Sequence, residues 1–127
     1  MTSATEERIR ELTQGMLRKK LYVVLSTAKA GPDRIKDVLP RHLEYMIGLE
    51  KKGLVFASGP LTDEGGEPRG DGMTILRAAS AEEARTIAAA DPFFAHGLRT
   101  FEVREWTVME GTLGLTVNFS DQSIQVA

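Results

Sequence analysis

The chain has 127 residues, with 16 Lys and Arg against 18 Asp and Glu, so its formal charge is −2. This length allows one domain with a real core, and the charge provides no basic surface for nucleic acid or membrane. The absence of cysteine excludes thiol nucleophiles, disulfides and thiolate metal sites. No apolar run is long enough to span a membrane, and no signal or transit peptide is apparent. We therefore expect a cytoplasmic protein made of a single domain, residues 1–127.

The N-terminal segment is expected to form an amphipathic helix over residues 4–19. Ser3 followed by Glu6 fits a capping box, and apolar residues recur at helical spacing after it. The next segment, residues 21–27, is apolar, β-branched and too short for a helix, which predicts a buried strand. This strand opens the core of the domain, which we expect to cover residues 21–109.

A second helix is predicted over residues 34–52, with Gly53 in the position of a C-terminal cap. Pro40 lies inside this segment. Because proline lacks an amide donor and disfavours helical geometry at the preceding residue, the helix either starts late or kinks. A second buried strand is predicted after it, over residues 54–61.

The polar, glycine-rich residues 62–72 show no periodicity and predict a long loop that is either mobile or functional. They match neither a phosphate-binding loop nor a dinucleotide fingerprint. A third strand is expected over residues 73–78. Ser80 followed by Glu83 then predicts a capped helix that ends at Ala90.

Asp91 and Pro92 fit an N-cap and a first helical residue, which predicts a short helical turn. A fourth strand is predicted over residues 98–109. It is apolar on both faces, so either both faces are covered or a bulge switches the register. The C-terminal extension, residues 110–127, is expected to add a strand or a hairpin with a turn near Ser120.

The order strand, helix, strand, strand, helix, strand predicts an α+β fold, a ferredoxin-like split βαβ sandwich. In this fold an antiparallel sheet carries two helices on one face. Its other face stays uncovered in a single chain, and Trp106 and Val108 indicate that it is apolar. Pairing two such sheets would cover it, so we expect a homodimer, with a higher oligomer left open.

His42 lies near the centre of the apolar arc of the second helix. The two helices of a split βαβ fold run antiparallel, so the half that holds His42 should approach Asp91. A carboxylate beside an imidazole fixes its tautomer and raises its basicity, as proton transfer requires. The alternatives are a buried histidine with satisfied nitrogens, and Asp91 as a helix cap worth about 1 kcal/mol.

Four further residues are candidates for the walls of a substrate cleft. Ser58, Gly59 and Pro60 end the second strand, where a turn is the competing interpretation. Tyr22 begins the first strand and either adds a hydroxyl to the cleft or packs in the core. His96 is expected to be exposed at a helix end, and no histidine spacing indicates a metal site.

The segment LPRHLEYMIGLEKKGLVFASGPL, followed by AEEARTIAAADPFFAHGLRTFEVREWTV, resembles the YciI-like (YCII-related) family. The resemblance implies a ferredoxin-like subunit that forms a dimeric α+β barrel. It also implies an active site made of His42 and Asp91, with Ser58, Gly59 and Pro60 along the same cleft. A characterised relative removes chloride from a chlorinated hydroxyhydroquinone. The N-terminal helix and the tail after Glu110 depart from the common pattern.

These observations favour a small cofactor-independent lyase or isomerase that acts on a compact, aromatic or lactone-like substrate. His42 would be the general acid and base, oriented by Asp91. The alternative is a non-catalytic dimeric module that binds a small molecule or another protein. A site requires His42 to be reachable in a pocket beside Asp91, whereas a structural role requires it to be sealed. A metal or haem site lacks a second ligand at a sensible spacing, so no metal or cofactor is expected.

Overall fold

The computed structural model describes residues 3–127, so Met1 and Thr2 of the expected single domain lie outside the described residues. Two parts of the chain are each compact. The central unit is residues 20–107, and the terminal unit combines the residues before and after it. The central unit contains the helices and strands of the predicted sandwich.

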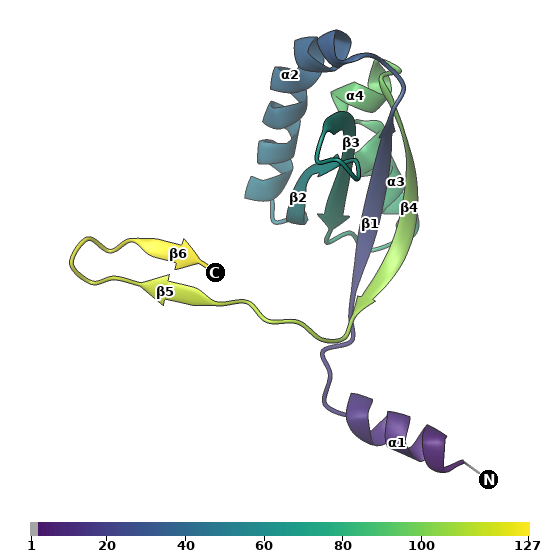
Figure 1. Ribbon diagram of the computed structural model, residues 1–127, viewed down its shortest axis with the longest axis vertical. Helices are drawn as coiled ribbons and strands as arrows, with labels where there is room; N and C mark the ends of the chain where they lie inside the picture. The colour runs from purple at the N-terminus through teal and green to yellow at the C-terminus, as the bar shows by residue number, and fades with distance from the viewer. Residues whose placement is uncertain (1–2) are drawn as a thin grey trace. The chain divides into compact units, whose positions relative to one another are not determined.

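The central unit is built on a four-stranded antiparallel sheet with the spatial order β2-β3-β1-β4. Its β3 pairs with β1 on one side, where Tyr22 lies opposite Leu76, and with β2 on the other, where Ser58 lies opposite Thr74. Figure 1 shows β4 beside β1 and running in the opposite direction. The order confirms the ferredoxin-like sheet expected from the sequence. The strands are β1 (Lys19–Ala28), β2 (Val55–Thr62), β3 (Pro68–Leu76) and β4 (Arg99–Val108).

The helices of the central unit are α2 (Pro32–Lys51), α3 (Ala81–Ala89) and α4 (Pro92–Ala95). Figure 1 shows α3 and α4 behind the sheet. The buried Ala84 of α3 belongs to the same cluster as Tyr22, Val24 and Leu76 of the sheet. In a second cluster, Val38 of α2 packs with Phe93 and Leu98. Burying each large apolar side chain contributes roughly 1.5–3 kcal/mol.

Among residues 3–127, no helix has the length and apolar character needed to cross a membrane.

The limits of α2 follow from its end residues. Pro32 occupies the first turn, where the fixed φ of proline suits a helix and its missing amide is not needed. At the other end Gly53, with φ 77°, donates its amide to the Glu50 carbonyl. The helix thus begins two residues before the predicted start. It also continues through Pro40 rather than starting late.

The predicted long loop over residues 62–72 is wrong, because β3 already begins at Pro68. Asp63 closes the short connection between β2 and β3 with two hydrogen bonds. Its Oδ1 accepts one from the Glu67 amide at 3.0 Å, and its Oδ2 accepts one from Nε of Arg69 at 2.8 Å. These bonds, first that from Glu67, lower the pKa of Asp63. Local hydrogen bonding by an aspartate can form a turn without any apolar periodicity, so the hydrophobic pattern did not reveal the hairpin.

In the terminal unit, α1 (Ala4–Thr13) is shorter than the predicted helix over residues 4–19. Its capping box is confirmed: Ser3 Oγ accepts the Glu6 amide, and the Glu6 carboxylate accepts the Ser3 amide. Gly15, a weak helix former, follows the end of the helix closely. Arg18 has φ 52°, which lies outside the right-handed helical region.

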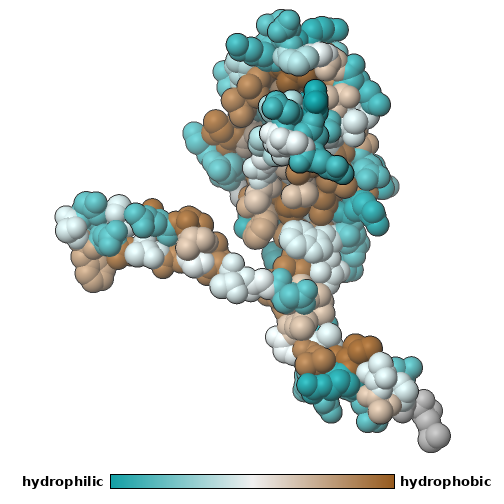
Figure 2. Space-filling view, in the orientation of Figure 1, coloured by the Kyte–Doolittle hydropathy of each residue, from teal (hydrophilic) through white to brown (hydrophobic). Residues whose placement is uncertain are grey.

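The C-terminal extension forms the hairpin of β5 (Leu115–Val117) and β6 (Ile124–Val126). The predicted turn near Ser120 is confirmed. An isolated two-stranded hairpin is only marginally stable in water, yet this one exposes many large apolar side chains, as Figure 2 shows. They are Leu113, Leu115, Val117, Phe119, Ile124 and Val126.

The sheet face opposite the helices is apolar along β1 and β3. Side chains alternate along a strand, so Val23 and Leu25 of β1 and Met73 of β3 point away from the helix-facing cluster. Trp106 alternates with Val103 of that cluster in the same way and is 39 % exposed. The apolar character expected for this face from Trp106 is therefore present at its centre, while the exposed Glu102 and Arg104 of β4 lie on the same face.

Two glycines of the β2–β3 hairpin offer a matched test of how closely β3 approaches Ala28 at the end of β1. Gly66 and Gly70 both have positive φ, but a Cβ on Gly70 would lie 3.0 Å from the Cβ of Ala28, whereas a Cβ on Gly66 would meet nothing within 4 Å. Gly66→Ala should cost about 1 kcal/mol through backbone strain alone. Gly70→Ala should cost about 1–3 kcal/mol more, because it adds overpacking. Urea unfolding of both variants measures the difference, and equal losses would contradict the close approach to Ala28.

Candidate active site

An open groove of ≈ 800 Å³ lies between α2 and the strands β2 and β3. This volume suits a small organic ligand. Most of the lining is apolar, and Figure 2 shows hydrophobic residues gathered over this part of the central unit. A few polar side chains interrupt the apolar surface. Those used below are His42, Ser58, Asp71, Thr74 and Arg99.

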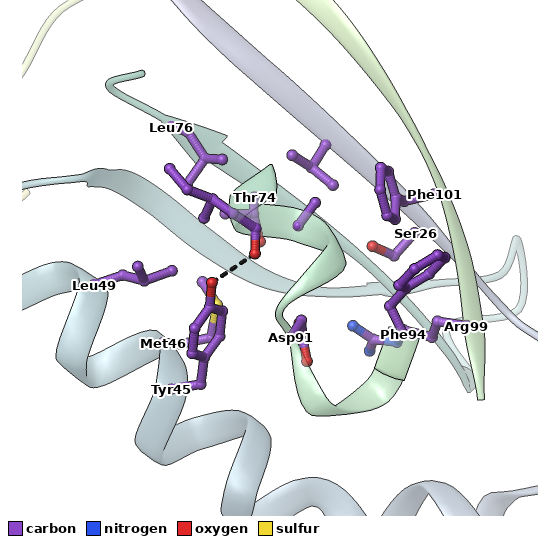
Figure 3. A pocket seen from close by; sticks show the side chains of 13 residues that line it. Ser26, Tyr45, Met46, Leu49, Thr74, Leu76, Asp91, Phe94, Arg99 and Phe101 are labelled. Atoms are coloured by element: carbon purple, nitrogen blue, oxygen red, sulfur yellow. Dashed lines mark hydrogen bonds between the residues drawn. The ribbon is translucent and has the colours of Figure 1, made fainter. Parts of the chain in front are cut away.

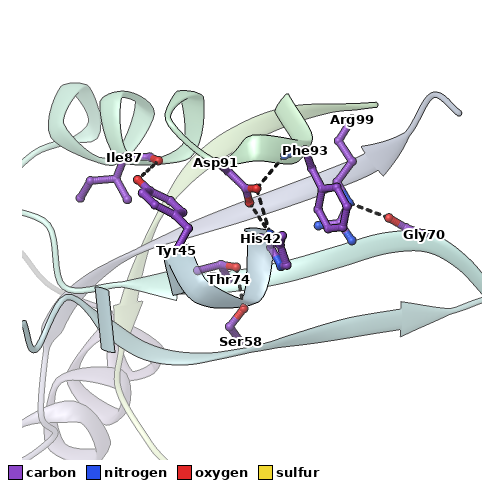
Figure 4. Close-up of polar contacts among 9 residues, drawn as sticks. All are labelled: His42, Tyr45, Ser58, Gly70, Thr74, Ile87, Asp91, Phe93 and Arg99. Carbon is purple, nitrogen blue, oxygen red and sulfur yellow. Dashed lines mark hydrogen bonds and ion pairs between the residues drawn. The ribbon is translucent and has the colours of Figure 1, made fainter. Parts of the chain in front are cut away.

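His42 and Asp91 are in direct contact, as expected from the topology. The Nδ1 of His42 lies 2.9 Å from Oδ1 and 2.8 Å from Oδ2 of Asp91 (Figure 4). A carboxylate only accepts hydrogen bonds, so Nδ1 of the imidazole must be the donor. A neutral His42 therefore carries its lone pair on Nε2, the nitrogen on the far side of the ring.

Asp91 also performs the structural role that the sequence suggested. Its Oδ1 accepts the amide of Phe93 at 2.9 Å, which caps the N-terminus of α4. The Phe93 ring, fully buried, stacks on the His42 ring with their centroids 4.3 Å apart. The imidazole is thus held both by a carboxylate and by an aromatic face, which limits its rotation.

The two members of the pair differ in their access to the groove. His42 is among the residues that line the groove, whereas Asp91 lines a smaller cavity behind it. The exposed fractions of the two side chains are 13 % and 16 %. The imidazole is therefore largely enclosed but not sealed from the groove.

The smaller cavity has a volume of ≈ 20 Å³, which is room for about one water molecule. Asp91, Arg99, Tyr45 and Thr74 are among its lining residues (Figure 3). The Tyr45 hydroxyl donates to the carbonyl of Ile87 at 2.6 Å. Burial, and next the negative charge of Asp91, raises the pKa of Tyr45, so its phenol stays a neutral donor at physiological pH.

Arg99 begins β4 and lines both the groove and the smaller cavity. Its Nε donates to the carbonyl of Gly70 at 2.7 Å, and its Cζ lies 4.3 Å from the centroid of the Phe93 ring. Burial lowers the pKa of Arg99, while Asp91 and Asp71 act in the opposite direction. Arginine nevertheless stays charged in proteins, so the groove contains a fixed positive charge.

The other residues expected in the cleft are divided between the groove and the core. Ser58, Gly59 and Pro60 all line the groove, and Ser58 Oγ lies 2.7 Å from Oγ1 of Thr74. The prediction that Tyr22 lines the cleft is wrong. Its register opposite Leu76 puts it in the cluster beneath α3, where it is buried and lines neither cavity.

The second histidine lies apart from the groove. His96 is exposed at the C-terminal cap of α4, as expected, and its Nε2 is 3.4 Å from Nη1 of Arg41. Among residues 3–127, no three His, Asp or Glu side chains come together in a way that could hold a metal ion.

The sequence interpretation missed Tyr45, Phe93 and Arg99. Tyr45 follows His42 by three residues, which places both on neighbouring positions of one helix face. Arg99 precedes Phe101 by two residues, so the two share a face of β4. Both signals were present in the sequence, but neither residue had a known partner before the fold brought Tyr45 to the smaller cavity and Arg99 to both the cavity and the groove.

Comparisons with known proteins agree with this architecture. Residues 20–107 match the YCII-related domain, and no curated protein matches the chain. A similar solved structure is the 5-chloro-2-hydroxyhydroquinone dehydrochlorinase from Burkholderia phenoliruptrix, in complex with 2,5-dihydroxybenzoquinone. It is 24 % identical with a TM-score of 0.56, and the match covers 68 % of this chain and 93 % of that one. At this identity the likeness shows a shared fold.

The variant Asp91→Asn tests the proton arrangement of the pair. Asparagine is also a good N-cap, so the stability of α4 should change by less than about 1 kcal/mol. The amide cannot favour a proton on Nδ1 as a carboxylate does, so the share of His42 with its proton on Nε2 should rise. Side-chain ¹⁵N NMR at alkaline pH measures the tautomer of both proteins, with His96 as the internal control. A wild-type His42 with its proton on Nε2 would contradict the assignment.

Proposed function

The chain belongs to the YCII-related family, and from that premise we propose that it is a small-molecule enzyme in which His42 transfers a proton. One observation supports this most strongly: a groove-lining imidazole is hydrogen-bonded through Nδ1 to a carboxylate behind it. A histidine needed only for packing would be sealed from the groove. The proposal makes His42 the general acid and base, and Asp91 the residue that positions it.

The proposed reaction begins when Nε2 of His42 accepts a proton from the bound substrate. The imidazolium that forms is stabilised by the adjacent negative charge of Asp91. If the same proton returns to another atom of the substrate, the enzyme is an isomerase. If the electron pair left by the proton expels a leaving group and forms a double bond, the enzyme is a lyase. Both outcomes balance without an added oxidant or cofactor.

The proposed substrate is a compact ring, aromatic or lactone-like. The mostly apolar groove favours a ligand with a flat hydrophobic body, and the hydroxyls of Ser58 and Thr74 could bind a ring oxygen. Gly59 and Pro60 would contact the same ligand with their backbone and ring. The similar dehydrochlorinase acts on a chlorinated hydroquinone and was solved with a dihydroxyquinone bound. Such molecules fit the proposed class.

A second candidate function is a non-catalytic module that binds a small molecule in the same groove. The capping bond that the Phe93 amide donates to Asp91 favours it, because this bond gives Asp91 a structural role without any chemistry. The two candidates differ only in turnover, since both need the groove to be occupied.

We further propose that the protein is a homodimer in which two sheets meet through the apolar face opposite the helices. Val23, Leu25, Met73 and Trp106 would form the centre of that interface. An uncovered apolar sheet is typical of a surface that associates. A cytoplasmic location, as expected from the sequence, stays a prediction.

Turnover is tested with 5-chloro-2-hydroxyhydroquinone by chloride release and with 2,5-dihydroxybenzoquinone by binding. His42→Gln should lower the rate by about two to four orders of magnitude, because it removes the general base. Asp91→Asn should lower it less, and His96→Gln, the matched control, should leave it unchanged. Chloride release that survives His42→Gln would contradict the mechanism. Quinone binding without any release would favour the non-catalytic module.

The dimer is tested by size-exclusion chromatography with light scattering. Trp106→Lys should convert a dimer to a monomer, because two lysines would face each other across an apolar interface. Ile9→Lys, which adds the same charge at an exposed apolar residue of α1, is the control and should stay dimeric. A monomeric wild-type protein, or a dimeric Trp106→Lys variant, would contradict the proposed interface.

A further inference from the structure

The guanidinium of Arg99 is anchored at one edge only. Its Nε donates to the Gly70 carbonyl, and its Cζ lies over the Phe93 ring. Within the part of the chain that the structure describes, neither Nη1 nor Nη2 has a hydrogen-bond partner. These nitrogens provide the paired donors that match a planar oxyanion. Figure 3 shows them on the side of the small cavity that Asp91 also lines.

The positive charge of Arg99 is not neutralised by a salt bridge. Among residues 3–127 the salt bridges join other side chains, and none involves Arg99. Asp71, the carboxylate of the neighbouring hairpin, instead accepts the amide of Ala28 at 2.8 Å. Asp91 and Asp71 act on the charge of Arg99 without forming a salt bridge with it, so its Nη nitrogens stay available to an anionic ligand.

The hairpin between β2 and β3 is shaped around this guanidinium. Gly70, with φ 87°, directs the carbonyl that holds Nε. At Gly72 a Cβ would lie 3.2 Å from Nη1 of Arg99, so a larger residue would displace the guanidinium. The absence of a side chain at Gly72 leaves Arg99 space beside the groove.

Arg99 and His42 lie close enough to act on one small molecule. Both contact the ring of Phe93, where the His42 centroid and the Arg99 Cζ each lie 4.3 Å from the ring centroid. Both also line the groove. The imidazole and the guanidinium therefore both lie against one aromatic side chain of the groove, a separation that a substituted ring can bridge.

We propose that Arg99 is the anion-binding group of this groove, and that its ligand is a small planar molecule with a carboxylate or an ionised phenol. This inference deepens the proposed function and rests on it for the identity of the groove as a substrate site. When His42 removes a proton from such a ligand, negative charge develops on the conjugated oxygen. Arg99 is placed to stabilise that charge, which gives it a role both in specificity and in the chemical step.

The matched ligands benzoate and benzamide test the charge preference, because they share a shape and differ in charge. Binding is followed by NMR through the ring signals of His42, with 4-nitrophenolate to separate a phenolate from a carboxylate. The wild-type protein should bind at least one anion about tenfold more tightly than benzamide. Arg99→Gln should abolish that preference while leaving benzamide binding within about twofold. Failure of both anions to bind would overturn the proposal.

Two further variants separate recognition from folding. Arg77→Gln is the matched control, since Arg77 also donates to a backbone carbonyl and lies over an aromatic ring but does not line the groove. It should keep the full preference. Gly72→Ala keeps the arginine and shifts its guanidinium, so it should weaken anion binding by a smaller factor than Arg99→Gln. A preference that survives in Arg99→Gln, or that disappears in Arg77→Gln, would overturn the assignment.

Failure of the anion site at Arg99 and failure of the proposed catalysis by His42 give different results in these experiments. Anion binding that depends on Arg99, in a protein without turnover, would uphold this site and reject the catalytic proposal. Turnover that depends on His42 but is indifferent to Arg99 would uphold catalysis and reject the anion site.

Discussion

The carboxylate of Asp91 joins two helices. It accepts one hydrogen bond from Nδ1 of His42 in α2 and another from the Phe93 amide at the start of α4. The first bond orients the imidazole and the second fixes the carboxylate itself. The capping bond is local to α4, whereas the bond to His42 forms only when α2 and α4 are packed together. The position of the imidazole therefore depends on the same contact that begins α4, and the candidate chemistry cannot be separated from the packing of these helices.

Phe93 extends this constraint to the second polar group of the groove. Its ring is fully buried and contacts both the imidazole of His42 and the guanidinium of Arg99. Because close-packed interiors transmit small displacements, a change at Phe93 would move both groups together. The groove thus combines a base and a cation whose separation is set by one apolar side chain, while its walls remain mostly hydrophobic.

The hairpin after β2 contributes geometry rather than side-chain chemistry. Asp63 closes its turn, and the carbonyl of Gly70 holds Arg99. This explains why the segment is rich in polar residues and glycine without matching any known phosphate-binding pattern. The Gly70 carbonyl can hold Arg99 only because the fold places β4, which is distant in sequence, on the other side of β1.

The sequence by itself determined the element order, the capped helix starts at Ser3 and Ser80, and the turn near Ser120, because these depend on local hydrogen bonds and on hydrophobic periodicity. It also indicated that His42 and Asp91 would meet, since antiparallel helices in this topology leave few alternatives. It did not determine the hairpin at Asp63, the burial of Tyr22 or the site of Arg99. Those depend on strand register and on side chains far apart in the chain, and only the tertiary structure decides which face of a strand meets a helix.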